Sequence, residues 1–255
     1  MLRAMENTMT QPLQSKPDYG IDAPAVLRNL FLFGTLCIIL RFTAPRLVHL
    51  GSIDVLLHPM FAWTGGFLLA EAFLFLYYVK VGKFGHRDLI LSLHTWRGDE
   101  QVLDVGCGRG LLLAGAAKHL TTGHATGLDI WSTTDMGGNA AAATERNLQL
   151  EGIADRCTLV SEGAQAMRFA DASFNVIVSN LCLHNIYDRP TRQKAVAEIA
   201  RVLKPGGVAI LSDYKLTAEY AQQLTAEGLA VTRRWGNPLA TFPPLRIVIA
   251  RKPIV

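Results

Sequence analysis

Two long apolar stretches dominate the first third of the chain. The first runs from residue 23 to 42, and Arg28 and Arg41 flank its uncharged centre. The second runs from residue 56 to 79 and contains one acidic residue, Glu71. Each stretch has the length of about 20 residues that, as a helix, crosses a hydrocarbon core roughly 30 Å thick. The pattern therefore predicts two apolar helices joined by a short turn.

These two helices have two interpretations. They form a transmembrane hairpin, or they pack on the rest of the chain or on a second subunit, so homo-oligomerisation through them stays open. Glu71 argues for caution, because an acidic group at mid-bilayer costs several kcal/mol and must face the partner helix, a second protomer or water. The length of the stretches favours the membrane, and Trp63, Tyr77 and Tyr78 lie where an interfacial aromatic belt would fall.

The rest of the chain alternates short apolar runs with helical patterns. Strands alternating with helices predict an α/β fold, here a Rossmann-like seven-stranded mostly parallel sheet with helices on both faces. The last two strands have no helix between them, which fits a reversed final strand. The expected helices cover residues 84–96, 111–120, 139–151, 190–203 and 217–227, and the expected strands cover residues 101–105, 124–129, 157–161, 174–179, 208–212, 229–235 and 245–251.

Composition narrows the class of protein. The formal net charge of +4 is too small to indicate a nucleic-acid partner. The four cysteines lie far apart, which argues against a metal site and against a disulfide framework. Polar residues fill the start of the chain, so the predicted organisation is a disordered tail (1–22), an apolar hairpin (23–79) and a sheet domain (80–255).

A glycine-rich turn follows the first strand of the predicted sheet. Residues 101–110 are Gln-Val-Leu-Asp-Val-Gly-Cys-Gly-Arg-Gly, and a helix rich in Leu and Ala follows. Strand, glycine turn and helix form the nucleotide-binding arrangement of doubly wound sheets. A dinucleotide fingerprint would need glycine where Leu111 stands, and a P-loop would need Gly-Lys-Ser/Thr. The spacing therefore argues against both NAD and a P-loop nucleotide.

Two acidic residues accompany the glycines. Asp104 stands two residues before Gly106, and Asp129 ends the next strand, about 20 residues on, where an acid can hydrogen-bond a ribose diol. Each acid has a structural alternative, since Asp104 could cap the following turn and Asp129 could cap a helix. Their occurrence together with the glycine turn favours ligand binding.

These motifs together resemble class I methyltransferases that use S-adenosylmethionine (SAM), in the branch that acts on small molecules and lipids. Residues 102–110 resemble motif I of that family, and residues 174–180 (Phe-Asn-Val-Ile-Val-Ser-Asn) resemble its fourth strand. Residues 199–207 (Ile-Ala-Arg-Val-Leu-Lys-Pro-Gly-Gly) resemble the helix and turn before its fifth strand. The resemblance covers most of residues 101–251 and implies SAM as the cofactor.

The resemblance also assigns cofactor residues, with one departure. Gly163 stands where the family usually has an aspartate that contacts the adenine amino group, which leaves the backbone of Ala164 for that contact. The resemblance assigns Asp104, Gly106 and Gly108 to the methionine half, Asp129 to the ribose, Ile130 and Trp131 to the adenine, and Asn180 and Leu181 to the closing of the site. The other residues assigned to cofactor binding are Cys107, Gly110, Gly163 and Ala164.

The acceptor side follows from topology, because ligands of such sheets bind at the carboxyl ends of the strands. This rule brings residues 180–187 and residues 213–214 to the same pocket. His184 is the first candidate for a general base and Tyr214 the second, and a base is needed if the nucleophile is a hydroxyl, a thiol or a protonated amine. His184 has the alternative of a local hydrogen bond in a loop. Asn185 and Tyr187 are further candidate contacts, whereas His58 and His86 are expected at an interface or on the surface.

The leading hypothesis is a membrane-associated SAM-dependent methyltransferase for a small-molecule or lipid-like acceptor. Because SAM is a cytosolic metabolite, the sheet domain is expected on the cytoplasmic side, and Lys80, Lys83 and Arg87 agree with a positive-inside bias. Arg41 and Arg46 at the other end weaken that bias. The alternatives are a polar soluble acceptor and a non-catalytic SAM-binding membrane module; Leu111 disfavours an NAD-dependent oxidoreductase.

Overall fold

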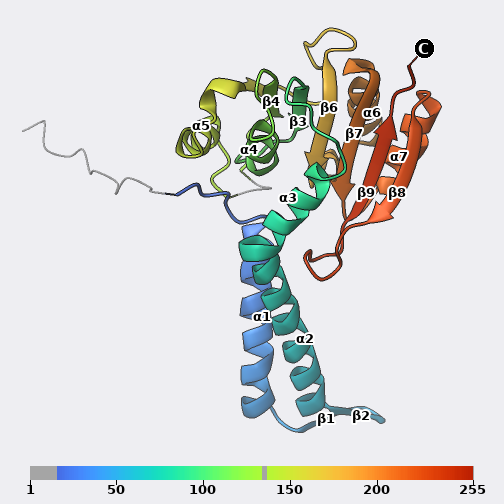
Figure 1. The fold of residues 1–255 in the computed structure, drawn as a ribbon. Coiled ribbons are helices and arrows are strands. Elements are labelled where there is room, and N and C mark those ends of the chain that lie inside the picture. Colours follow the sequence, from blue (N-terminus) through green and yellow to red (C-terminus); the bar gives the residue numbers. More distant parts are fainter. Residues whose placement is uncertain (1–15, 134–136, 255) are drawn as a thin grey trace, which may run out of the picture.

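A seven-stranded sheet forms the body of the molecule, and two helices project from it as a stalk (Figure 1). The computed structural model describes residues 16–133 and 137–254. The predicted fold class, a Rossmann-like sheet preceded by a helical hairpin, is confirmed. In chain order the elements are α1 (Pro24–Thr43), β1 (Leu47–Leu50), β2 (Ile53–Leu56), α2 (Leu57–Tyr77), η1 (Tyr78–Gly82), α3 (Lys83–Leu91), β3 (Gln101–Val105), α4 (Leu111–Ala117), β4 (His124–Asp129), α5 (Ala141–Leu150), η2 (Ala154–Arg156), β5 (Cys157–Ser161), β6 (Phe174–Asn180), η3 (Leu183–Asn185), α6 (Arg189–Val202), β7 (Leu203–Asp213), α7 (Thr217–Ala226), β8 (Ala230–Trp235) and β9 (Arg246–Arg251).

The strand order of the large sheet is β5-β4-β3-β6-β7-β9-β8. The strands from β5 to β7 pair in parallel, and β9 runs antiparallel to both of its neighbours, so the predicted reversed strand is present. The chain enters the sheet at β3, which lies between β4 and β6. The carboxyl ends of these three strands therefore meet at one edge, the place where ligands bind in sheets of this kind.

Apolar side chains cover both faces of the sheet, because neighbouring residues of a strand point to opposite faces. Val176 and Val178 of β6 pack in one cluster with Leu113 of α4. Ile177 between them packs in a second cluster with Ile199 of α6. Burial on both faces explains why the central strands are continuous apolar runs in the sequence.

The two stalk helices approach closely at two glycines. A Cβ placed on Gly65 would lie 2.9 Å from the Ile38 Cδ1 and 3.0 Å from the Gly34 carbonyl oxygen. Further along the stalk, the rings of Phe31 and Phe73 meet edge to face at 5.3 Å. Both helices are long and apolar enough to cross a membrane, judged by length and composition alone.

The connection between the stalk helices differs from the predicted turn. Strands β1 and β2 form a two-stranded antiparallel sheet at the far end of the stalk, with Leu50 paired to Ile53 (Figure 1). A turn was predicted here, but the β-branched and Leu-rich runs on either side of it are too short for their pattern to distinguish strands from the helical stretches.

The second apolar helix does not end where the sheet domain was predicted to begin. Helix α2 continues through the short π-helix η1 into α3, so one helical rod runs from Leu57 to Leu91. The expected helix over residues 84–96 therefore starts inside this rod and stops five residues early. Gly82 lies against the Ala240 carbonyl, since a Cβ there would overlap it, and this contact joins the rod to the loop between β8 and β9.

Part of the predicted disordered tail is ordered. Residues 16–22 of that tail are described, and Tyr19 is buried against the sheet domain. The Tyr19 hydroxyl donates a 2.6 Å hydrogen bond to Glu151, which lies 132 positions later in the chain. Local composition carries no signal of such a distant contact. Residues 1–15 lie outside the described residues.

Strand β7 begins at Leu203 and not at residue 208, and α6 ends at Val202. Gly206 and Gly207 therefore lie inside a strand, where the resemblance implied the turn that precedes it. Leu203 pairs with Phe174 of β6, and the register shifts before Val176 pairs with Val208. This irregularity accommodates the Pro-Gly-Gly turn within the strand.

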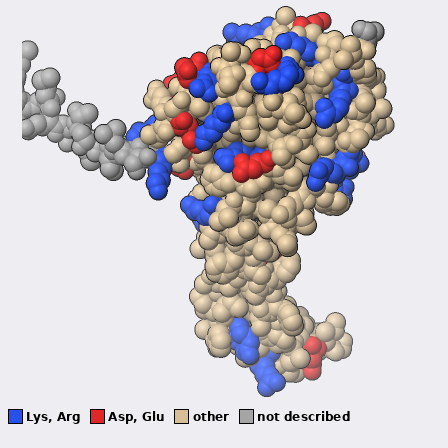
Figure 2. Space-filling model, viewed as in Figure 1, with Lys and Arg blue, Asp and Glu red and all other residues tan. Residues whose placement is uncertain are grey.

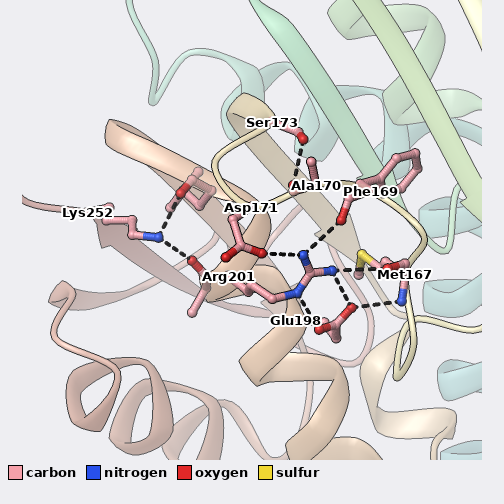
Figure 3. A network of polar contacts seen from close by, with 10 residues as sticks. Met167, Phe169, Ala170, Asp171, Ser173, Glu198, Arg201 and Lys252 are labelled. Carbon is pink, nitrogen blue, oxygen red and sulfur yellow. Dashed lines mark hydrogen bonds and ion pairs between the residues drawn. The ribbon is translucent and has the colours of Figure 1, made fainter.

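An arginine of α6 holds the long segment between β5 and β6 (Figure 3). The Arg201 guanidinium donates to both carboxylate oxygens of Glu198, at 2.7 and 2.8 Å, and to Asp171 at 2.7 Å. It also donates to the backbone carbonyls of Met167 and Phe169 at 3.0 and 2.8 Å. The segment that follows Ala164 is thereby fixed to α6.

Candidate active site

The glycine turn folds back over the end of β4. The amides of Gly106 and Cys107 both donate to the Leu128 carbonyl, at 2.7 and 3.1 Å. Gly106 has a φ of +74°, and a Cβ at this position would overlap the Cys182 side chain. Only glycine lets the turn reach this conformation and lie against the segment that follows β6.

Asp129 connects the glycine turn to the loop after β4. Its Oδ2 accepts a 2.8 Å hydrogen bond from the Gly108 amide. Its Oδ1 accepts from the Trp131 amide at 2.6 Å and from the Asn139 side chain at 3.2 Å. Asp129, which was predicted to bind the ribose, thus links the glycine turn to the loop after β4 and helps to fix the conformation of both.

Asp104 lies on β3 below the turn and is 1% exposed. Among residues 16–133 and 137–254, neither of its carboxylate oxygens has a partner with hydrogen-bond geometry, and the same holds for the Oδ1 atoms of Asn139 and Asn180. Burial raises the pKa of Asp104 to about 8, and the nearby Asp129 carboxylate adds to the shift. Unsatisfied buried acceptors are rare and costly. These four oxygens, on three residues near the glycine turn, fit a ligand with a cationic or hydroxyl-bearing group, as SAM has.

The predicted adenine side is more open. Ile130 is 68% exposed, and the Trp131 ring donates a 2.7 Å hydrogen bond to the Ser161 hydroxyl of β5. Ala164 is buried. Gly163 precedes it, and a Cβ there would press on the Gln165 side chain. The structure thus brings all four predicted residues to the carboxyl ends of β4 and β5.

The acceptor-side candidates also come together. His184 Nδ1 lies 2.8 Å from Asp213 Oδ1, and the side chains of both residues are largely buried. The Tyr214 ring meets the His184 ring edge to face at 4.8 Å. Tyr187 is 81% exposed, so it lies at the rim. Asn180 and Leu181 precede this group at the end of β6, and Leu181 packs against the cluster at the upper end of the stalk.

His86 was expected at an interface or on the surface, and this was wrong. It is 1% exposed, and its Nε2 lies 2.7 Å from the Ser212 hydroxyl of β7. Burial lowers the pKa of His86 to about 4, so the ring is neutral at pH 7. His86 belongs to α3, and its burial follows from docking of that helix on the sheet, which a lone histidine does not reveal in a sequence.

Two structural partners were missed by sequence reasoning. Asp213 was placed near the pocket by topology, but its pairing with His184 depends on the register of β7 against β6. The segment around Asp18 was assigned to the tail, yet Asp18 Oδ2 lies 3.0 Å from the Arg109 guanidinium in the glycine turn. No local motif marks either contact.

Comparison with known proteins agrees with this geometry. Residues 103–211 match a family model described as a methyltransferase domain. The sterol 4-C-methyltransferase strm-1 of Caenorhabditis elegans is 34% identical over 118 residues, which are 46% of this chain and 32% of that protein. The chain spans 51%, 40% and 32% of the length of the first three curated relatives that it matches.

Solved structures share the fold at low sequence identity. A SAM-dependent methyltransferase from Aquifex aeolicus has a TM-score of 0.53 and 17% identity, over 67% of this chain and 91% of that one. The [4+2]-cyclase SpnF has a TM-score of 0.57 and 16% identity, over 92% of this chain and 100% of that one. Structural likeness therefore shows the class I methyltransferase fold, and residues 103–211 match the sequence model of a methyltransferase domain.

Proposed function

We propose that this chain is a membrane-anchored SAM-dependent methyltransferase whose acceptor is a small molecule or lipid with an apolar body. The observation that carries the proposal is the contact between the glycine turn and the acceptor side. Gly106 lies against Cys182, and Cys182 is two residues before His184. The cofactor-binding turn and the candidate base therefore share one edge of the sheet.

SAM supplies a methyl group on a sulfonium, whose sulfur leaves as a neutral thioether, so positioning provides much of the rate. The chain would hold it with the side chains of Asp104 and Asp129 and with the glycine turn. Asn180, at the carboxyl end of β6, would bind the cofactor or the acceptor. His184 would take the acceptor proton, and Asp213 would orient the imidazole and stabilise its charge.

The dimensions of the stalk support membrane anchoring. At a rise of 1.5 Å per residue, α1 with 20 residues and α2 with 21 are each about 30 Å long, the thickness of a hydrocarbon core. Most of their side chains face outward, including Phe33 at 58% and Trp63 at 81% exposure. A water-soluble monomer rarely shows so large an apolar surface. Close helix contact through glycines, as at Gly34 and Gly65, is common between membrane helices.

Charge also supports this placement. Figure 2 shows charged side chains over the sheet domain and at the far end of the stalk, with none over the middle of the stalk on this face. At the far end, Arg41 Nη1 contacts His58 Nδ1 at 2.9 Å, which sets a polar border there. Glu71 is the exception within the span and is half-buried. The sheet domain would lie on the cytoplasmic side, where SAM is made.

The stalk also supports an apolar acceptor, because its upper end reaches the site. Leu27, Phe75 and Val79 of the stalk helices form a cluster in which Leu181 and Phe242 of the sheet domain take part. Leu181 directly follows Asn180 at the end of β6. An acceptor dissolved in the near leaflet would thus meet apolar side chains next to the candidate base.

A second candidate function is a membrane module that binds SAM without turning it over. Gly163, at the position of the usual adenine-binding aspartate, favours it. The test is methyl transfer from tritiated SAM by the full chain in detergent or nanodiscs, with total lipid extract in one arm and water-soluble metabolites in the other. Label in the lipid phase, lost in Asp129→Ala, supports the proposal. Label in the soluble arm alone rejects the lipid acceptor, and SAM binding without label in either arm supports the module.

A further inference from the structure

A short segment just before α1 crosses the cofactor edge of the sheet. We call residues 18–22 the N-terminal strap. Asp18 pairs with Arg109, whose backbone lies between Gly108 and Gly110 of the glycine turn. The strap then runs directly into α1, which begins at Pro24. One end of the strap is therefore on the cofactor turn and the other is on the stalk.

A buried asparagine clips the strap to the glycine turn. Asn147 of α5 is 1% exposed. Its Nδ2 donates to the carbonyls of both Asp18 and Arg109 at 2.9 Å, and its Oδ1 accepts from the Asp18 amide at 2.9 Å. One side chain thus binds the backbone of both the strap and the glycine turn, so a displacement of one segment displaces the other.

The strap is fixed on its other side by α3. The Lys83 ammonium, 5% exposed, donates to the carbonyls of Tyr19 and Gly20 at 2.8 and 2.7 Å. These charge-assisted bonds and the buried Tyr19 ring hold the strap in one conformation.

The strap also reaches the loop after β4, the strand that ends at Asp129. A Cβ placed on Gly20 would lie 2.8 Å from Arg109 Cδ and 3.6 Å from the Gly137 carbonyl oxygen. Gly137 in turn approaches the Pro24 ring at the start of α1. The strap therefore contacts both the glycine turn, through Arg109, and Gly137 in the loop after β4. Asp129 links the same two regions through its hydrogen bond to the Gly108 amide.

We propose that the N-terminal strap fixes the glycine turn and Gly137 in the arrangement that binds the cofactor, so that Asp18, Gly20 and Asn147 are positioning residues for SAM. The inference rests on the proposed cofactor. Opening the strap frees Arg109 and the turn, so the ligand must order them at its own cost and binds more weakly. Because the strap continues into α1, the position of the stalk relative to the sheet domain and the affinity for the cofactor are coupled.

The test is calorimetric titration of the full chain with S-adenosylhomocysteine, which binds the same site without transferring a methyl group. Gly20→Ala, at a φ of +66° and against Arg109, is expected to weaken binding about tenfold, the size of a typical coupling. The matched control is Gly228→Ala, which has a φ of +83° with nothing within 4 Å and shares the backbone strain. Asp18→Ala, half-exposed in its pair with Arg109, is the second variant and is expected to weaken binding several-fold.

Amide hydrogen exchange distinguishes a positioning role from a purely structural one, because ligand binding would leave the exchange rates of a purely structural strap unchanged. If the closed strap increases the affinity for the ligand, linkage requires that bound ligand disfavours opening of the strap by the same factor. Exchange of the amides of residues 18–22 should therefore slow on S-adenosylhomocysteine binding in the wild type. Unchanged affinity in both strap variants, or unchanged exchange at saturation, overturns the inference. Absence of binding by the wild type overturns the proposed cofactor instead.

Discussion

His184 Nδ1 lies 2.8 Å from Asp213 Oδ1, so a largely buried carboxylate is paired with the imidazole at the acceptor side of the site. Asp213 is itself held by the amides of Tyr214 at 2.8 Å and His184 at 3.3 Å and by the Tyr220 hydroxyl at 3.3 Å. The carboxylate is thus fixed at ion-pair distance from the imidazole, although within the described residues His184 Nδ1 has no partner with hydrogen-bond geometry. The pairing gives the proposed base a specific test.

His184→Ala is expected to lower the rate of methyl transfer about 100-fold or more, the usual contribution of a general base. Binding of S-adenosylhomocysteine should not change, because His184 is assigned to the acceptor. Raising the pH should restore part of the rate, since the acceptor then loses its proton without help. The assay is transfer of tritiated methyl groups to lipid extract, with His124→Ala, a strand histidine bonded to Thr158, as the control. Full activity in His184→Ala contradicts the role.

Asp104→Asn is expected to stabilise the chain at alkaline pH and to weaken SAM binding. The pKa of Asp104 is raised by burial to about 8, so the folded chain keeps a proton that the unfolded chain releases near pH 4. The contribution of Asp104 to the free energy of unfolding is fully present below about pH 4 and is lost as the pH rises to about 8. The uncharged amide avoids this loss. Thermal unfolding from pH 5 to pH 8 should show a gap in favour of the variant that widens with pH; a constant gap contradicts the assignment.

Gly65→Leu is expected to separate the stalk helices, because its side chain would press on Ile38 and on the Gly34 backbone. Overpacking of this kind costs about 1–3 kcal/mol. Gly66→Leu is the matched control, since nothing lies within 4 Å of that position. The unfolding temperature in detergent should fall by several degrees for the first variant and stay near that of the wild type for the second. Equal effects would show that the glycine contact does not hold the stalk.

Arg201→Leu is expected to destabilise the sheet domain by about 1–3 kcal/mol, because it frees two backbone carbonyls and the Glu198 carboxylate. Arg201 holds the pKa of Glu198 below its usual range. The stabilisation is therefore present at neutral pH and is lost as the pH falls and Glu198 takes up a proton. Thermal unfolding at neutral and acidic pH should show a difference that shrinks on acidification. Arg168→Leu, in the exposed pair with Glu162, serves as the control.

The sheet and the cofactor edge could be predicted because their signals are local. Strands β3, β4 and β5 have the predicted bounds, and Gly106 and Asp129 stand beside each other because strand, turn and helix follow in the chain. The pairing of His184 with Asp213 could not be predicted, because it depends on the register between β6 and β7. The same holds for Tyr19 and Glu151, whose contact joins distant parts of the chain. The small sheet β1–β2 was not predicted, because apolar patterns in four-residue strands are too short to distinguish a strand from a helix.

The measurement that tests the central claim most directly is titration of the purified full chain with SAM, S-adenosylhomocysteine and NAD, beside the Asp129→Ala variant. The account predicts that SAM and S-adenosylhomocysteine bind and compete for one site, that Asp129→Ala loses both, and that NAD gives no signal. A folded chain that binds neither SAM nor S-adenosylhomocysteine, or that binds NAD at the glycine turn, would contradict it.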